Sequence, residues 1–237
     1  MSKKQQFLYA LKKSIPVFLG FIFLGIAFGI VLESAGFNWL WALLISTLVY
    51  AGSMQFALVP LLTASTPLST IALMTLMVNS RHLFYGLSFV DMFKSMGKKY
   101  PYMIFSLTDE TYSVLCSCAD DPDAHVDNHR PCFLIALLHQ CYWVAGSVIG
   151  AIAGELITFD TTGIDFSMTA LFVVILVDQL RAGGGDARRS ALIGLVLAVV
   201  FLLLLGAEKF LLPTLACTVL ALAVTAQLTG KKEAAHE

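Results

Sequence analysis

The hydrophobic positions of this chain fall into long runs of about 20 residues, separated by short polar stretches. No charged residue occurs between Glu33 and Arg81. An α-helix needs roughly 20 apolar residues to cross a bilayer core of about 30 Å. The pattern therefore predicts an all-α, polytopic membrane protein with a single transmembrane permease domain over residues 1–237. Its predicted membrane segments are residues 16–32, 39–62, 68–90, 100–119, 132–156, 168–180, 190–207 and 210–230.

The predicted number of transmembrane helices is about seven, because two of these segments are short or interrupted. Residues 1–14 contain four lysines and predict an amphipathic helix on the cytoplasmic face, followed by a retained first span. Counting spans from there places Lys94, Lys98 and Lys99 outside, against the positive-inside tendency. Either an early segment re-enters without crossing, or the tendency is overridden. Residues 119–131 are acidic and are predicted to form an external loop.

Composition supports the membrane class and argues against others. Hydrophobic residues make up 58% of the chain and charged residues 13%, about half the charged fraction of a soluble domain. Basic residues do not form a patch with interleaved aromatics, so we expect no nucleic-acid binding. The five cysteines match no zinc spacing, and the common hydrolase motifs are absent from the sequence. We therefore expect no metal, no cofactor and no enzymatic activity.

A small, polar segment, Ala51-Gly52-Ser53, lies halfway along the predicted span 39–62 and is a candidate helix break. Glycine weakens a helix, and unwound backbone at lipid depth is tolerated only where it is buried or lines a cavity. The freed N–H and C=O groups, together with the amide of Gln55, could hold a carboxylate or an ammonium group. The alternative is an intact helix with small residues at a packing seam.

The segment NSRHLFYG, residues 79–86, places a charge well inside the predicted span 68–90. Such a charge costs about 2.5 to 3.5 kcal/mol on insertion scales and usually marks a function. The guanidinium of Arg81 suits a carboxylate, and His82 titrates near neutral pH and could carry a proton. Asn79 and Tyr85 can donate to a ligand. The alternative is that Arg81 extends to a nearby interface.

Asp109 and Glu110 are adjacent carboxylates in the predicted segment 100–119. One could pair with Arg81 while the other binds an ammonium group or a proton. The alternative is a helix N-terminus at the membrane surface, with Thr108 or Asp109 as its cap and Glu110 in the first turn. His139, in the middle of the predicted span 132–156, is interpreted as a hydrogen-bonded packing residue more readily than as a proton relay.

The sequence also contains a possible internal repeat with interrupted helices. GFNWLWALLISTLV begins at Gly36 and GIDFSMTALFVVIL begins at Gly163. Each follows glycines spaced four residues apart, which let helix backbones approach closely: Gly25 and Gly29 in one case, Gly146, Gly150 and Gly154 in the other. Repeats with broken helices at the substrate site are common in secondary transporters. The sequence leaves open whether the repeat is inverted or parallel.

Five stretches in order, PVFLGFIFLGIAFGIVLESAG, SxxVYAGSMQF, VNSRHLFYG, LTDETY and GIDFSMTALFVVIL, resemble the AzlC family, the large permease subunit of branched-chain amino acid exporters. The resemblance covers about residues 16–178. It implies a permease of the bacterial cytoplasmic membrane that works with a small hydrophobic AzlD-like subunit. It also implies export of valine, leucine, isoleucine or analogues, driven by a proton gradient.

The resemblance assigns no substrate residues, so the site is predicted from the residues themselves. Substrate binding is predicted for Gly52, Ser53, Gln55, Asn79, Arg81 and Tyr85, and proton coupling for His82, Asp109 and Glu110. Two other functions stay open at this point. One is a structural or regulatory membrane subunit of a complex, and the other is a passive channel for small solutes.

Overall fold

The structure, a computed structural model, describes residues 1–119, 121–156 and 184–206, together with residues 173, 176–177, 180–181, 210, 213–214, 216–222 and 224–225. These residues are mostly helical and contain no β-strand, which confirms the all-α class. The chain divides into two compact units, residues 1–168 and 169–237.

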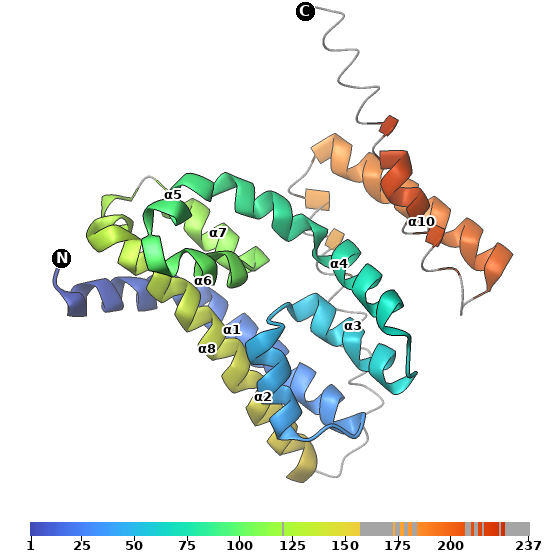
Figure 1. The fold of residues 1–237 in the computed structure, drawn as a ribbon, viewed down its shortest axis with the longest axis horizontal. Coiled ribbons are helices and arrows are strands. Elements are labelled where there is room, and N and C mark those ends of the chain that lie inside the picture. The colour runs from blue at the N-terminus through green and yellow to red at the C-terminus, as the bar shows by residue number, and fades with distance from the viewer. Residues whose placement is uncertain are drawn as a thin grey trace, which may run out of the picture. The chain divides into compact units, whose positions relative to one another are not determined.

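The first unit contains every residue of the predicted site. Its elements are α1 (Lys3–Ser34), α2 (Trp39–Leu48), α3 (Gly52–Thr63), α4 (Leu68–Ser88), α5 (Val90–Ser95), η1 (Gly97–Lys99), α6 (Tyr100–Phe105), α7 (Asp109–Ser117), η2 (Pro122–Ala124) and α8 (Val126–Leu156) (Figure 1). The second unit contains α10 (Gly184–Leu205). The second copy of the possible repeat, from Gly163, lies almost wholly outside the described residues, so the repeat stays a prediction.

Three described helices are long and apolar enough to cross a membrane: Lys3–Ser34, Val126–Leu156 and Arg188–Leu205. Shorter apolar helices cover Trp39–Leu48, Gly52–Thr63 and Leu68–Ser80. The predicted segment 39–62 is therefore two helices rather than one span. The total of about seven spans also involves residues 168–180 and 210–230, which the structure describes only in part, and it stays a prediction.

Helix α1 is continuous, so the predicted N-terminal helix and the first span form one element. Its start is fixed by a capping box, in which the Ser2 hydroxyl accepts from the Gln5 N–H and the Gln5 side chain accepts from the Ser2 N–H. Pro16 lies inside the helix without ending it.

Helices α1 and α8 run parallel and pack backbone against backbone. Their contacts keep the same order along both helices: Phe18 with Tyr142, Gly25 with Gly146, Gly29 with Gly150, and Glu33 with Gly154. A Cβ atom added to Gly25 would lie 2.9 Å from the carbonyl oxygen of Trp143. The close approach predicted from the glycine spacing is confirmed.

The first residues of α1 and the segment that leads into α8 meet at one end of this unit. The Tyr9 hydroxyl donates to Asp121 at 2.7 Å, and Lys13 lies 3.4 Å from the same carboxylate. Lys99 donates to the carbonyl of Asn128 at 3.3 Å. A buried apolar cluster joins these segments, with the members Ala10, Phe89, Phe93, Met96, Met103, Leu107, Leu115, Cys118, Ala124, Cys132, Ile135 and Ala136.

This shared end bears on two predictions about topology. The N-terminus and residues 121–131 of the predicted loop lie at the same end, so a cytoplasmic N-terminus and an external loop exclude each other. Lys99 also lies at the end where Lys13 is found, which removes the conflict with the positive-inside tendency. In Figure 1, α2 and α3 form two arms that meet beside α8, and α4 then returns towards α5. Whether residues 39–63 re-enter or cross the membrane stays a prediction.

Candidate functional site

The first interruption consists of Val49, Tyr50 and Ala51, between α2 and α3. Tyr50 has a φ of +43°, in the left-handed region that non-glycine residues rarely adopt. The predicted break is thus confirmed, but Gly52 and Ser53 form the first turn of α3 instead of the unwound segment. The first N–H groups of a helix have no intrahelical acceptor and carry the positive end of its dipole. Ala51, at the N-cap, supplies no side-chain acceptor.

Gln55 holds this interruption in place. Its side chain is fully buried. Its Nε2 donates to the Ser46 hydroxyl at 3.1 Å, and its Oε1 accepts from the Ala51 N–H at 3.2 Å and from Trp143 Nε1 at 2.9 Å. Gln55 therefore ties α2, the unwound residues and α3 to α8. These bonds all go to the protein, so Gln55 positions the site.

Trp143 also covers the start of α3. A Cβ atom added to Gly52 would lie 3.2 Å from Cη2 of the indole ring, closer than ordinary van der Waals contact. A Cβ atom at Gly52 would therefore require the indole ring to shift by a few tenths of an ångström.

The second interruption consists of Ser106, Leu107 and Thr108, between α6 and α7. The Thr108 hydroxyl caps α7 by accepting from the Thr111 N–H at 3.3 Å. Asp109 and Glu110 form the first turn of α7, where the helix dipole stabilises negative charge. The helix N-terminus capped by Thr108 is confirmed, and its position at the membrane surface stays a prediction. Asp109 and Glu110 lie next to an interruption like that before α3.

One turn of α8 binds both interrupted segments. His139 Nδ1 lies 2.9 Å from the Thr111 hydroxyl of α7. The Gln140 Oε1 accepts from the Tyr102 hydroxyl of α6 at 2.7 Å, and its Nε2 donates to the carbonyl of Thr47 in α2 at 3.1 Å. With the bond from Trp143 to Gln55, this turn fixes α2, α3, α6 and α7. It is the structural centre of the candidate site.

The sequence interpretation gave Gln140 and Trp143 no role, and it favoured packing for His139. The hydrogen bond to Thr111 agrees with that interpretation of His139. The available signal was the run His139-Gln140-Cys141-Tyr142-Trp143, an unusual group of polar and aromatic side chains in the middle of an apolar span.

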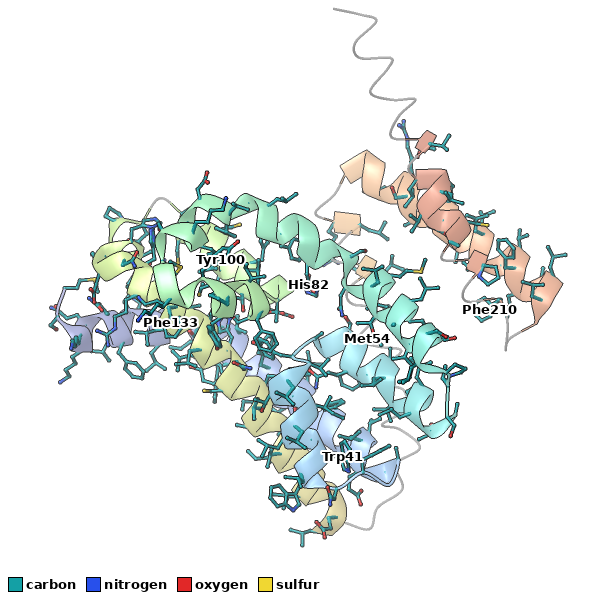
Figure 2. The ribbon with its side chains drawn as sticks, viewed as in Figure 1. Trp41, Met54, His82, Tyr100, Phe133 and Phe210 are labelled. Carbon is teal, nitrogen blue, oxygen red and sulfur yellow. The ribbon has the colours of Figure 1, made fainter. Side chains whose placement is uncertain are left out.

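The residues predicted from NSRHLFYG lie in the second half of α4. Tyr85 stacks on Tyr112 of α7, with ring centroids 4.4 Å apart, and its ring lies 5.8 Å from that of His82. The buried Oδ1 of Asn79 has no hydrogen-bond partner among the described atoms. The side chain of Arg81 lies outside the described part, so its pairing with Asp109 or Glu110 stays a prediction. Figure 2 marks His82 on α4 and Met54 in the first turn of α3.

The predicted site residues are thus distributed over three elements of the first unit. Gly52, Ser53 and Gln55 belong to α3, and the two carboxylates belong to α7. Tyr85 joins α4 to α7 through Tyr112, and the Tyr50 ring lies 6.1 Å from the Phe105 ring, which connects the two interruptions. Helix N-termini and carboxylates are groups that can bind a small solute carrying both charges.

The fold and site define an all-α membrane protein with two interrupted helical segments joined by a long helix. The chain belongs to the AzlC family, because the family model described as AzlC protein matches residues 16–157. This range contains every predicted site residue.

Several relatives support this membership. The branched-chain amino acid transport protein AzlC of Bacillus subtilis is 42% identical over 220 residues, 91% of this chain and 85% of the relative. A membrane protein of Helicobacter pylori is 38% identical, over 91% of this chain and 95% of the relative. The inner membrane protein YgaZ of Escherichia coli is 26% identical, over 81% of each chain. No solved structure matches this chain.

Proposed function

We propose that this protein is a secondary transporter that exports branched-chain amino acids across the bacterial cytoplasmic membrane. The Bacillus subtilis relative is named for transport of branched-chain amino acids. The observation that carries the proposal is the meeting of two interrupted helical segments on one turn of α8. Interrupted helices expose backbone groups at membrane depth, and transporters use such groups to bind polar solutes.

The site offers complementary groups for a zwitterion. The N-terminus of α3, at Gly52 and Ser53, carries the positive end of a helix dipole, about half a unit charge, and suits the carboxylate. Arg81 supplies the full countercharge in this proposal. Asp109 and Glu110 suit the ammonium group, and the buried Oδ1 of Asn79 is a further acceptor.

Proton coupling and a partner subunit complete the proposal. His82, Asp109 and Glu110 are titratable groups in or beside the site, and one of them carries the coupled proton. A small hydrophobic AzlD-like subunit assembles with this chain in the membrane, as the family resemblance implies. In this proposal transport makes or breaks no covalent bond and requires no cofactor.

The experiment uses proteoliposomes that contain this chain with its small subunit. We expect exchange of labelled leucine, and uphill movement of leucine on an imposed pH gradient. Arg81→Ala is expected to reduce exchange at least about tenfold, because a bond between charged groups contributes roughly 1.5 to 3 kcal/mol. Arg81→Lys keeps the charge and should retain part of the activity. Arg130→Gln, which removes a partly exposed ion pair with Asp127, should match the parent.

Three outcomes would contradict the proposal. If Arg81→Ala exchanged leucine at the parent rate, the carboxylate role of Arg81 would be wrong. If Arg81→Ala no longer assembled with the small subunit, but each complex that did assemble transported leucine at the parent rate, the role of Arg81 would be structural. If leucine moved only down its gradient, the protein would be a channel.

A further inference from the structure

We infer that His125 and His129 form a pH-sensitive latch at the start of α8. The latch is closed while the pair carries at most one positive charge, and it opens when both rings are protonated. It fastens α6 and α7, the two helices on either side of the second interruption. Its effect on transport rests on the function proposed above, whereas the opening of the latch does not.

The two histidine rings are bonded directly to each other. Nδ1 of His125 lies 2.9 Å from Nδ1 of His129, and Nε2 of His125 lies 2.7 Å from the carbonyl oxygen of Ala119. A carbonyl oxygen only accepts, so Nε2 of His125 carries a hydrogen. Both histidines are half-buried, so protons from water can reach them.

These bonds limit the number of protons that the closed pair can hold. When His125 is neutral, its hydrogen is on Nε2, so its Nδ1 accepts from Nδ1 of His129. When one ring is charged, that ring donates from Nδ1 and the neutral ring accepts. When both rings are charged, both Nδ1 atoms carry hydrogens and neither can accept. The bond is then lost, and the two positive charges repel each other.

The latch closes over a strained stretch of backbone. Asp127, Asn128 and His129 have φ values of 51°, 55° and 54°, in the left-handed region. Residues keep such a conformation only where the surrounding contacts fix it. One contact is the histidine pair, and another is the bond from Lys99 to the Asn128 carbonyl at 3.3 Å. The third is the ion pair of Arg130 with Asp127 at 3.6 Å.

The latched segment is connected to both α6 and α7. Ala119, whose carbonyl accepts from His125, lies shortly after the end of α7. Lys99, whose ammonium group donates to Asn128, directly precedes α6. When the histidine bond is lost, the ends of both helices are held less firmly. The second interruption and the carboxylates in the first turn of α7 lie between these ends.

Histidine is the side chain that ordinarily changes charge between about pH 5 and 8. The charges that act on His129 are those of His125 and Lys99. The other charged or titratable groups at this end of the first unit are Tyr9, Lys13, Cys116, Cys118, Asp121, Asp123, Asp127 and Arg130. The hydrogen bond from Tyr9 keeps the pKa of Asp121 below its usual value of 3.8, so Asp121 stays charged over this range.

The latch is tested by hydrogen exchange of backbone amides in the full chain in micelles. The Ala124 N–H donates to the Asp121 carbonyl at 3.0 Å. The His125 N–H donates to the Pro122 carbonyl at 3.2 Å. Both amides are protected while the segment is closed. After correction for intrinsic rates, amide exchange of residues 121–130 in the parent should be about tenfold faster at pH 5 than at pH 7.5, because a bond to a charged ring is lost.

Two variants separate the bond from its titration. In His129→Asn the amide can donate to a neutral His125 or accept from a charged one, and asparagine tolerates the left-handed backbone. This variant should exchange slowly at both pH values. His125→Ala removes both bonds of the ring, so it should exchange at pH 7.5 as fast as the parent does at pH 5. Arg130→Gln is the matched control, since it removes the ion pair of the same segment and should keep the parent's ratio of rates.

The effect on transport is measured as leucine exchange in proteoliposomes with the same pH on both sides. Groups that carry the coupled proton make the parent and the variants depend on pH alike, so the difference between proteins reports the latch. From pH 7.5 to pH 5 the parent should lose a larger fraction of its leucine exchange than His129→Asn. His125→Ala should already be slower than the parent at pH 7.5, because α6 and α7 are held less firmly.

Two results would overturn the latch. One is amide exchange of residues 121–130 that stays the same between pH 7.5 and pH 5, and the other is equal acceleration in the parent and His129→Asn. If the latch opens but both proteins lose the same fraction of leucine exchange, its role in transport is wrong. If the parent exchanges no leucine, the proposed function fails, and the latch is judged from amide exchange alone.

Discussion

The closest approach between α1 and α8 makes a strong prediction about Gly29→Ala. A Cβ atom at Gly29 would lie 2.5 Å from the backbone nitrogen of Ala151 and 2.9 Å from the carbonyl carbon of Gly150, and it would overlap the carbonyl oxygen of Ser147. Carbon atoms need about 3.5 to 4 Å at optimal separation. The helices must therefore separate by roughly 1 Å, because the obstructing atoms are backbone and cannot rotate away.

The expected cost follows from two opposing effects. Overpacking costs typically about 1 to 3 kcal/mol, whereas replacing glycine by alanine inside a helix gains about 1 kcal/mol. Opening the seam also gives up a quarter to a half of the dispersion energy of each lost contact. We expect Gly29→Ala to be destabilised by a net amount of up to about 2 kcal/mol.

Gly20 provides the matched control on the same helix. A Cβ atom there would meet nothing within 4 Å. The purified proteins are unfolded in micelles by titration with a denaturing detergent. In this titration Gly20→Ala should be as stable as the parent or slightly more stable. Gly29→Ala should unfold at a clearly lower detergent fraction. Equal stability of the two variants would refute the close backbone packing.

Two further predictions concern the interruption and the shared end. Gln55→Leu leaves the Trp143 Nε1–H and the Ala51 N–H without acceptors. Each unpaired buried donor destabilises the folded state by about 1 to 3 kcal/mol, so the melting temperature and the rate of leucine exchange should both fall. An unchanged melting temperature would contradict the role of Gln55. The hydrogen bond from Tyr9, aided by Lys13, lowers the pKa of Asp121 below its usual value of 3.8. Because that pKa is lower in the folded state, the contribution is present above about pH 4 and is lost as the pH falls through the folded value. Hydrogen exchange of residues 3–13, corrected for intrinsic rates, should therefore speed up at low pH in the parent protein. Asp121→Asn should show this faster exchange already at pH 6. If the parent and Asp121→Asn had the same dependence of exchange on pH, the contact between Asp121 and α1 would be contradicted.

The sequence was sufficient to predict the membrane class, the glycine seam and the existence of the first interruption. Each of these depends on local composition or on fixed spacing along a helix. The long apolar runs follow from the thickness of the bilayer, and glycines four residues apart lie on one face of a helix. The interruption was predicted close to its position because Gly52 and Ser53 are poor residues for a helix interior.

The backbone conformation of the first interruption could not be predicted from the sequence. The left-handed residue is Tyr50, although glycine would have been expected there. Gln55 bonds to Ala51, the residue after Tyr50, and also to Trp143, which lies 88 residues after Gln55 in the chain. The contacts of α8 to Thr111 and Tyr102 likewise span 28 and 38 residues. Pairings over such separations depend on tertiary structure, which periodicity does not encode.

The central claim, that the amino acid binds at the first interruption, is tested most directly by cysteine labelling of Ser53→Cys. The background replaces Cys116, Cys118, Cys132, Cys141 and Cys217 by alanine, and Ser95→Cys, at an exposed position of α5, serves as the control. Leucine at ten times its Kd should slow labelling at position 53 about tenfold, since about one-tenth of the protein stays unoccupied, and should leave position 95 unchanged. Equal labelling at position 53 with and without leucine, in protein that still exchanges leucine, would contradict the account.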